Sequence, residues 1–320
     1  MAETHTSRIL QFERPVLELE EKITQLRRGG LPESAGEIVR LTKHLEDLEA
    51  RVYRDLSPWE QVQIARHPKR PTTMNYIDMI CDEFQELAGD RLYGDDAAVV
   101  GGLARIGDLR LVIVGHEKGR TTNGKIKHNF GMANPEGFRK SLRIMKLAEK
   151  FNMPVVSFVD TPGAYPGVGA EERGQPRAIA LNLKEAFGLR TPIVVVIIGE
   201  GGSGGALALA IGDRILMMEH AIYSVISPEG CAAILWKSKE KAPEAAASMR
   251  LTAADCLELG VIDAVIEELH GASHRDPKGN AMQLREIITS EIEALSNLSM
   301  DVLMKRRENK FYSMGMLEES

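Results

Sequence analysis

The chain has 320 residues, of which 43% are hydrophobic and 27% charged, and its 40 Lys and Arg residues against 46 Asp and Glu residues give a net charge of −6. This composition is that of an ordinary soluble globular protein and excludes collagen-like, disordered and disulfide-scaffold classes. The acidic total argues against a general binder of nucleic acid or anionic membranes. Length alone predicts about two domains.

Three features indicate a cytoplasmic protein. The longest purely apolar runs, such as residues 193–198, fall far short of the roughly 20 residues that span a membrane. Residues 1–12 lack the basic flank and apolar core of a secretory signal. The cysteines Cys81, Cys231 and Cys256 are odd in number, widely spaced and in no CxxC pair. We therefore expect a reducing compartment, no disulfide and no metal site in this chain.

Helical periodicity comes first along the chain. Residues 16–26 and 38–52 carry apolar residues at spacings of three and four, and the break at 27–32 between them predicts a helical hairpin that packs on the body or on a second subunit. The next helix is predicted to begin with Ser57 as N-cap, Pro58 at its first position and Glu60 completing a capping box. A further amphipathic helix is expected over residues 75–87.

From about residue 97, short β-branched runs alternate with glycines and helical stretches. The runs cover residues 97–100, 109–114, 155–159, 193–198 and 261–266. They predict an α/β core whose strands are buried on both faces. Residues 282–317 return to helical periodicity and include a basic run at 305–307. We expect an N-terminal helical segment (1–40), one large α/β domain (41–295) and a helical tail (296–320), in place of two similar domains.

Two of the predicted strands end in glycine-rich loops, at residues 160–169 and 199–208, and each loop leads directly into a helical stretch. Backbone N–H groups exposed at the start of a helix favour negative charge. Glycines without a Cβ also let a reacting oxygen approach these donors closely. We interpret the loops as a backbone oxyanion hole that requires no side-chain nucleophile.

The second loop also matches other signatures. A dinucleotide-binding fingerprint is disfavoured because its helix is interrupted at residue 212 and the motif does not follow the first strand. A serine-hydrolase elbow is disfavoured because four glycines around one serine satisfy that pattern by chance. Glycines chosen only for packing remain a third interpretation. The residues are Gly199, Gly201, Gly204 and Glu219 for the first signature, and Gly201, Ser203, Gly205, Asp263 and His270 for the second.

Residues 116–150 form a basic region with nine Lys or Arg against three Glu, a local balance of +6. A helix is predicted to begin at Asn134-Pro135, with Arg139, Arg143 and Lys146 along one face. Two interpretations stay open. The face is either solvated, or it meets the phosphates of a nucleotide-bearing substrate or an acidic partner chain.

Long blocks of the sequence resemble the carboxyltransferase α-subunit family of bacterial and plastid-type acetyl-CoA carboxylase. The blocks cover residues 115–120, 129–132, 135–137, 158–174, 198–208 and 223–237, and the similarity extends to the hairpin and the basic tail. The resemblance implies an α/β crotonase fold, like those of ClpP and enoyl-CoA hydratase, built as a spiral of ββα units. It also implies transfer of a carboxyl group from N-carboxybiotin to acetyl-CoA, which gives malonyl-CoA for fatty acid biosynthesis.

The same resemblance implies several partners. The chain would act only with a β subunit, in an α2β2 heterotetramer, and the zinc would belong to that subunit. Carboxybiotin would arrive on a separate biotin carboxyl carrier protein, with no cofactor attached to this chain, and biotin carboxylase would complete the larger complex. The alternatives are a stand-alone enoyl-CoA hydratase or isomerase, with Glu171 or Glu172 as acid or base, and a structural or regulatory subunit with a degenerate site.

The resemblance also assigns site residues. Gly204 and Gly205 would provide the backbone N–H groups that bind carboxybiotin, with Gly163 and Ala164 as the opposite wall. Biotin itself would take the methyl proton. The expected substrate-binding residues are Tyr165, Gly201, Gly202, Ser203, Lys118, Arg120, Lys125 and Lys127. Whether the basic stretch meets CoA phosphates or the β subunit stays open, as does the surface that contacts β.

Overall fold

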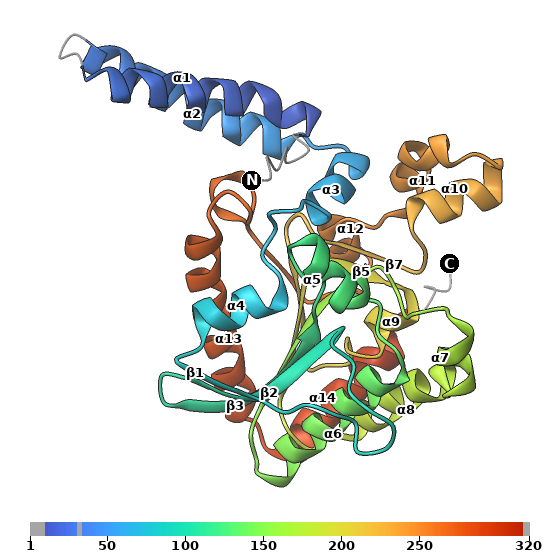
Figure 1. Cartoon of the computed structure of the whole chain (residues 1–320). Helices are drawn as coiled ribbons and strands as arrows, with labels where there is room; N and C mark the ends of the chain where they lie inside the picture. The colour runs from blue at the N-terminus through green and yellow to red at the C-terminus, as the bar shows by residue number, and fades with distance from the viewer. Residues whose placement is uncertain (1–9, 31–33, 316–320) are drawn as a thin grey trace, which may run out of the picture.

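The computed structural model describes residues 10–30 and 34–315 (Figure 1). Residues 1–9 lie outside this part, and they make up most of the segment 1–12 in which we expect no secretory signal. A mixed sheet of eight strands forms the centre of the body. A helical hairpin extends from the body at the N-terminal end, drawn in blue in Figure 1. No helix among the described residues is both long and apolar enough to cross a membrane.

The predicted hairpin is confirmed. A short η1 (Gln11–Glu13) precedes α1 (Arg14–Gly29), and α2 (Ala35–Arg54) returns antiparallel to it (Figure 1). Gly30 ends α1 with a φ of +64°, a left-handed conformation that glycine adopts without strain. Because α2 is continuous to Arg54, residue 40 lies inside the hairpin rather than after it.

The next two helices confirm one prediction and correct another. α3 (Pro58–Ala65) begins with the expected capping box of Ser57 and Glu60. α4 (Thr73–Ile80) ends seven residues before the predicted residue 87, so that prediction is wrong in its second half. The following strand, β1 (Glu83–Glu86), pairs antiparallel with β2. Pairing with a neighbouring strand therefore overrides the local helical pattern.

The sheet has the order β1-β2-β3-β4-β5-β6-β8, and β7 pairs with the end of β5. β2 is antiparallel to both of its neighbours, β1 and β3, and the pairs from β3 onward are parallel. All five predicted runs lie in or overlap strands, whereas β6 and β7 were not predicted. The bounds are β2 (Val99–Ile106), β3 (Leu109–His116), β4 (Val155–Thr161), β5 (Ile193–Gly202), β6 (Arg214–Met218), β7 (Ile222–Ser224) and β8 (Ala264–Ile266).

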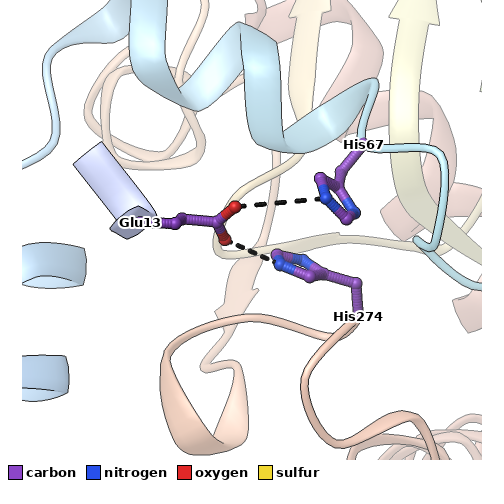
Figure 2. Close-up of side chains that lie close together, drawn as sticks. All are labelled: Glu13, His67 and His274. Atoms are coloured by element: carbon purple, nitrogen blue, oxygen red, sulfur yellow. Dashed lines mark hydrogen bonds and ion pairs between the residues drawn. The ribbon is translucent and has the colours of Figure 1, made fainter. Parts of the chain in front are cut away.

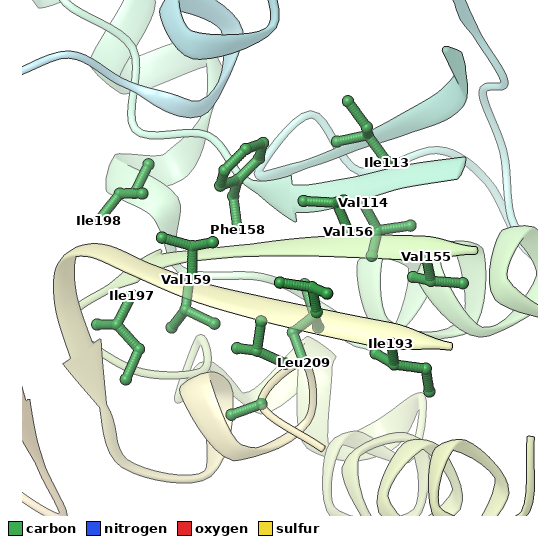
Figure 3. Close-up of a cluster of buried hydrophobic side chains, with 14 of the residues drawn as sticks. Ile113, Val114, Val155, Val156, Phe158, Val159, Ile193, Ile197, Ile198 and Leu209 are labelled. Carbon is green, nitrogen blue, oxygen red and sulfur yellow. The ribbon is translucent and has the colours of Figure 1, made fainter. Parts of the chain in front are cut away.

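The core lies on both faces of β4 and β5, as expected for parallel strands covered by helices. Every residue of β4 is buried, and Figure 3 shows branched side chains on both sides of the two strands. The remaining helices are α5 (Thr122–Lys127), η3 (Asn129–Gly131), α6 (Pro135–Lys150), α7 (Val168–Glu172), α8 (Gln175–Gly188), α9 (Ser203–Leu207), α10 (Pro228–Trp236), η4 (Lys239–Lys241), α11 (Ala242–Met249), α12 (Ala253–Glu258), η5 (Leu269–Gly271), α13 (Pro277–Ser296) and α14 (Met300–Ser313).

The last two helices confirm the predicted helical tail, although residues 316 and 317 lie outside the described part. α13 packs against α4, and α14 packs against α8. The three cysteines are free thiols, as expected.

Candidate active site

The two glycine-rich loops meet at one edge of the sheet. β4 and β5 are parallel neighbours, with Thr161 in register with Gly201, so both loops leave the same edge. A Cβ on Gly205 would lie 2.5 Å from the Ala164 nitrogen and 2.6 Å from the Gly163 carbonyl carbon. Only glycine fits this backbone contact. The structure thus brings together Gly163, Ala164 and Gly205, which the sequence separates by about forty residues.

The second loop passes directly from β5 into α9. Ser203 takes a φ of +52°, an unusual conformation for a residue with a side chain, and this turn starts the helix. Gly204 and Gly205 follow in the first turn, where backbone N–H groups have no acceptor within the helix. Gly205 is buried and Gly204 is half-buried. Both glycines therefore lie in the first turn of α9, and Gly204 is the more accessible of the two.

The first loop is held by its own hydrogen bonds. The Thr161 hydroxyl accepts from Gly163 N at 3.0 Å and donates to Gly163 O at 2.8 Å. Tyr165 N donates to Ala133 O at 3.0 Å, and the Tyr165 carbonyl accepts from Gln175 Nε2 at 2.9 Å. The Tyr165 ring lies over Gly167 of the same loop. Tyr165, expected as a substrate-binding residue, thus lies where it shapes this wall of the site.

A buried ion network lies beside the loops and joins the two strands. Lys118 Nζ lies 2.7 Å from Asp160 Oδ1, at the end of β4, and 2.6 Å from Glu200 Oε2, near the end of β5. Arg66 Nε lies 2.6 Å from Glu200 Oε1, and its Nη1 lies 2.5 Å from Glu229 Oε1. Lys118 is an expected substrate-binding residue, and it lines the cavity beside the loops. Its two ion pairs also fix the relative positions of the strands that carry the loops.

These charges are held in fixed protonation states. Burial alone would raise the pKa of Glu200, but the ion pairs with Lys118 and Arg66 outweigh the effect of burial and lower the pKa to about 2. Burial lowers the pKa of Lys118, yet Asp160 and Glu200 raise it above its usual value. Both groups therefore stay charged at neutral pH, and neither is suited to general acid–base catalysis.

His116 lies in the same region and is completely buried. Neither ring nitrogen has a hydrogen-bond partner among the described residues. Burial and the nearby Lys118 lower the pKa of His116 to about 3, so the ring is neutral at physiological pH. It adds no positive charge to the site.

A cavity of about 190 Å³ opens beside the ion network. Its lining includes Arg66, Lys118 and Lys125, together with Pro162 of the first loop and the exposed ring of Phe130. Asp160 and Glu200, the partners of Lys118 and Arg66, also line the cavity, so it combines paired charges and the cation Lys125 with apolar surface. Such a lining suits a ligand that has both a ring or thioester and anionic groups.

The basic region divides into two parts. Arg120 and Lys127 are exposed, and Lys125 is half-buried. In α6, Arg139 pairs with Asp90 at 2.7 Å, and Arg143 donates to backbone carbonyls of the loop before β2. These α6 side chains hold that loop in place. The first half of the basic face of α6 is therefore structural, whereas Lys146 and Lys150 further along the helix are exposed to solvent.

The serine-hydrolase signature is wrong for this fold. Ser203 follows the carboxyl end of β5, whereas Asp263 precedes β8 and accepts from Ile215 N, at the start of β6, at 2.7 Å. Since β5, β6 and β8 are parallel, Ser203 and Asp263 lie at opposite edges of the sheet. His270 is exposed and faces Asp276 at 4.0 Å. No triad is assembled from these residues.

The dinucleotide signature fails as well, because α9 has only five residues and cannot serve as the long first helix of a dinucleotide-binding unit. Glu171 and Glu172, considered for a hydratase, are exposed on the short α7.

Several solved structures share the fold. Transcarboxylase 12S aligns with 69% of this chain and 40% of its own, at 21% identity and a TM-score of 0.57. The β subunit of P. aeruginosa geranyl-CoA carboxylase aligns with 79% of this chain and 46% of its own, at 16% identity and a TM-score of 0.56. A chain of the Pseudomonas malonate decarboxylase hetero-tetramer aligns with 75% of this chain and 94% of its own, at 14% identity and a TM-score of 0.58. The expected crotonase-type α/β fold is confirmed.

The sequence comparisons identify the family. A family model described as acetyl co-enzyme A carboxylase carboxyltransferase-like matches residues 9–315. The acetyl-coenzyme A carboxylase carboxyl transferase subunit alpha of Xanthomonas campestris pv. campestris (strain B100) is 51% identical over 312 residues, 97% of this chain and 98% of that protein. The same subunit of Geobacter metallireducens is also 51% identical over 312 residues. The chain belongs to this carboxyltransferase family, and the resemblance of the sequence blocks is confirmed. The comparisons support this activity rather than the hydratase alternative.

Proposed function

We propose that the chain is the α half of the carboxyltransferase of acetyl-CoA carboxylase. It transfers the carboxyl group of N-carboxybiotin, carried on the biotin carboxyl carrier protein, to the methyl carbon of acetyl-CoA and so forms malonyl-CoA. Family membership over nearly the whole chain supports this activity. A β subunit with its own zinc would complete an α2β2 assembly, and biotin carboxylase would supply the carboxybiotin. We propose a cytoplasmic location for this complex.

One observation carries the proposal, namely the backbone contact between Gly205 and the Gly163–Ala164 turn. This contact supports a site in which the N–H groups of Gly204 and Gly205, in the first turn of α9, bind one oxygen of the substrate. Carboxybiotin supplies the carboxyl group, and negative charge develops on its ureido oxygen as that group leaves. The two N–H groups stabilise this charge, and each such donor contributes about 3–4 kcal/mol to the transition state.

The surrounding residues support this chemistry by position rather than by proton transfer. Glu200 and Lys118 stay ionised, so the methyl proton of acetyl-CoA is left to the biotin ring nitrogen. Gly201, Gly202 and Ser203 shape the turn into α9 and let the biotin ring approach. We assign Arg120, Lys125 and Lys127 to the anionic groups of the CoA substrate, because they lie on or beside the exposed α5 surface next to the cavity.

The test is a pair of substitutions at Gly204 in the reconstituted complex. A Cβ at this position would meet only Ile179, at 3.7 Å, so Gly204→Ala keeps the N–H without a clash. Gly204→Pro removes that N–H. We expect G204P to lower kcat for malonyl-CoA formation by about 10²–10³-fold. G204A should stay within a few-fold of wild type, and both variants should assemble normally in gel filtration. Equal rates for G204P and wild type would show that this N–H does not act in catalysis.

A further inference from the structure

Three side chains from distant parts of the chain converge where the hairpin meets the body. Glu13 comes from η1, His67 follows α3, and His274 precedes α13 (Figure 2). His274 Nε2 lies 2.7 Å from Glu13 Oε1, and His67 Nε2 lies 4.0 Å from Glu13 Oε2. The three side chains are only 4–6% exposed. The cluster lies outside the glycine loops and plays no part in the proposed transfer.

The arrangement of these groups resembles a ligand set. The two imidazole rings stack with centroids 3.9 Å apart, and Figure 2 shows the carboxylate reaching toward both rings. One ligand atom from each residue lies within 4.8 Å of the others.

We propose that Glu13, His67 and His274 form a binding site for a divalent transition metal of the zinc type. Two imidazoles and one carboxylate are a common zinc ligand set, with bond lengths of about 2.0–2.2 Å. The fourth position would be taken by water from an adjoining cavity of about 200 Å³, which is lined by all three residues. Donor atoms at such bond lengths around one tetrahedral ion lie about 3.4 Å from one another. His67 Nε2 and Glu13 Oε2, now 4.0 Å apart, would therefore move slightly closer, and His274 Nε2 and Glu13 Oε1, now 2.7 Å apart, would move slightly apart.

The local hydrogen bonds define what metal binding must change. Lys69 N donates to His67 Nδ1 at 3.2 Å, so the ring proton of metal-free His67 lies on Nε2. Metal binding at Nε2 moves this proton to Nδ1 and gives up that long hydrogen bond. Metal binding at His274 Nε2 would likewise move the ring proton to Nδ1, which is buried without a partner in the described part of the chain, and would replace the 2.7 Å hydrogen bond between Nε2 and Glu13 Oε1 by bonds to the metal.

The positive side chains near the cluster are largely neutralised by acidic partners, so they do not strongly repel a bound cation. Arg70 pairs with Glu268 at 2.5 Å, and Arg275 pairs with Glu20 and Glu49. Lys69 is exposed, so water screens its charge. With Glu13 ionised, a bound divalent ion leaves a formal local charge of +1 on the three ligands and the metal.

The position of the site gives the metal a structural consequence. It would join η1, at the start of the hairpin, to the segments beside α3 and α13. His67 also lines the cavity that holds Arg66 and Lys118. A metal at this point would fix the base of the hairpin and, through the adjacent Arg66, one wall of the active-site cavity.

The test is metal binding by the purified full-length chain after removal of metal with a chelator. Zn²⁺ is titrated in competition with a chromophoric chelator, and Co²⁺ replaces it for absorption and X-ray absorption spectra. We expect one Zn²⁺ per chain, coordinated by nitrogen and oxygen without sulfur. Glu13→Gln, His67→Asn and His274→Asn should each weaken binding by at least about 100-fold.

Two control variants distinguish the loss of a metal ligand from a general disturbance of this region. His270→Asn changes an exposed histidine near His274 and should bind Zn²⁺ as wild type does. Tyr53→Phe removes the hydroxyl that donates to Glu13 at 2.6 Å but keeps all three ligands, so it should also retain zinc. Zn²⁺ should raise the Tm of wild type and of these controls but not that of the ligand variants. Absence of tight binding, a sulfur ligand, or unchanged affinity in the ligand variants would overturn the proposal.

Discussion

At the scale of single residues, the site depends on charges that are fixed by their partners. Glu200 contacts Lys118 and Arg66, and each of these cations has a second acidic partner, Asp160 or Glu229. The network therefore ties β4, β5, α3 and α10 together around the glycine loops. In the proposed mechanism the network supports the loops whose backbone N–H groups stabilise an oxyanion, and it supplies no side-chain base.

Glu200→Gln tests this network through the pH dependence of stability. The pKa of Glu200 is about 2 in the folded chain against 4.5 as the ordinary value, so the carboxylate favours the folded state. Its contribution is present above pH 4.5 and is lost as the pH falls toward 2. We expect E200Q to lower the free energy of unfolding by about 1–3 kcal/mol at pH 7. The difference from wild type should shrink between pH 5 and pH 3 in urea titrations.

The exposed Glu171→Gln is the matched control and should leave stability unchanged at every pH. A difference between E200Q and wild type that stays constant from pH 7 to pH 3 would contradict the assigned ion pairs.

The sequence predicted the glycines of the site but not their supporting charges. Gly204 and Gly205 stand in a local pattern after an apolar run, and such a pattern can be recognised without a structure. The partners of Lys118 are Asp160 and Glu200, which are joined only by the packing of β4 against β5. The signal that could have found them is an acidic residue at the end of each of two neighbouring parallel strands. We expected no metal in this chain because the three cysteines form no zinc motif, and the Glu13, His67 and His274 cluster, spread over distant parts of the chain, has no spacing pattern that the sequence could reveal.

At the scale of elements, α14 is anchored to the body by one buried arginine. Arg307 belongs to the basic run noted in the sequence, but its side chain is completely buried. It donates to the Asp213 carboxylate at 2.6 and 2.9 Å and to carbonyls that include Leu189 O at 2.6 Å and Thr191 O at 2.8 Å. Asp213 in turn accepts from Ile193 N, at the start of β5. The tail helix is thus linked to the central sheet.

Arg307→Met should therefore destabilise the whole protein. The substitution leaves the Asp213 carboxylate buried without its charged partner, and breaking such a pair costs about 3–5 kcal/mol. Arg306→Met, one residue earlier on the exposed side of α14, should change stability by less than about 0.5 kcal/mol. Urea unfolding of the two variants measures both values. Similar stabilities for R307M and R306M would show that Arg307 does not anchor the tail.

The elements that sequence analysis missed are short and depend on pairing. β1 has the sequence Glu-Phe-Gln-Glu, which favours a helix locally, yet it forms the edge of the sheet against β2. β6 and β7 have five and three residues, too few for a periodic pattern. By contrast, the capping box at Ser57 and the apolar runs of β4 and β5 carry their own local signals and were predicted correctly.

At the scale of the whole molecule, the chain has features of one half of a larger enzyme. The glycine loops lie open at the edge of the sheet, with Gly204 only half-buried. α10, next to the ion network, exposes Ile234, Leu235 and Trp236, which are 62%, 64% and 45% accessible. Contiguous exposed apolar side chains on a helix are typical of an interaction surface. These features support the proposal that a β subunit completes the active site.

The most direct measurement is transfer of a labelled carboxyl group from the carboxylated biotin carrier protein to acetyl-CoA, followed as labelled malonyl-CoA. The assay compares this chain alone, the β subunit alone and the two together, and it also tests the lone chain for hydration of an unsaturated acyl-CoA. We predict malonyl-CoA only when both chains are present and no hydration by the lone chain. Hydratase activity of the lone chain, or no transfer by the assembled pair, would contradict the account.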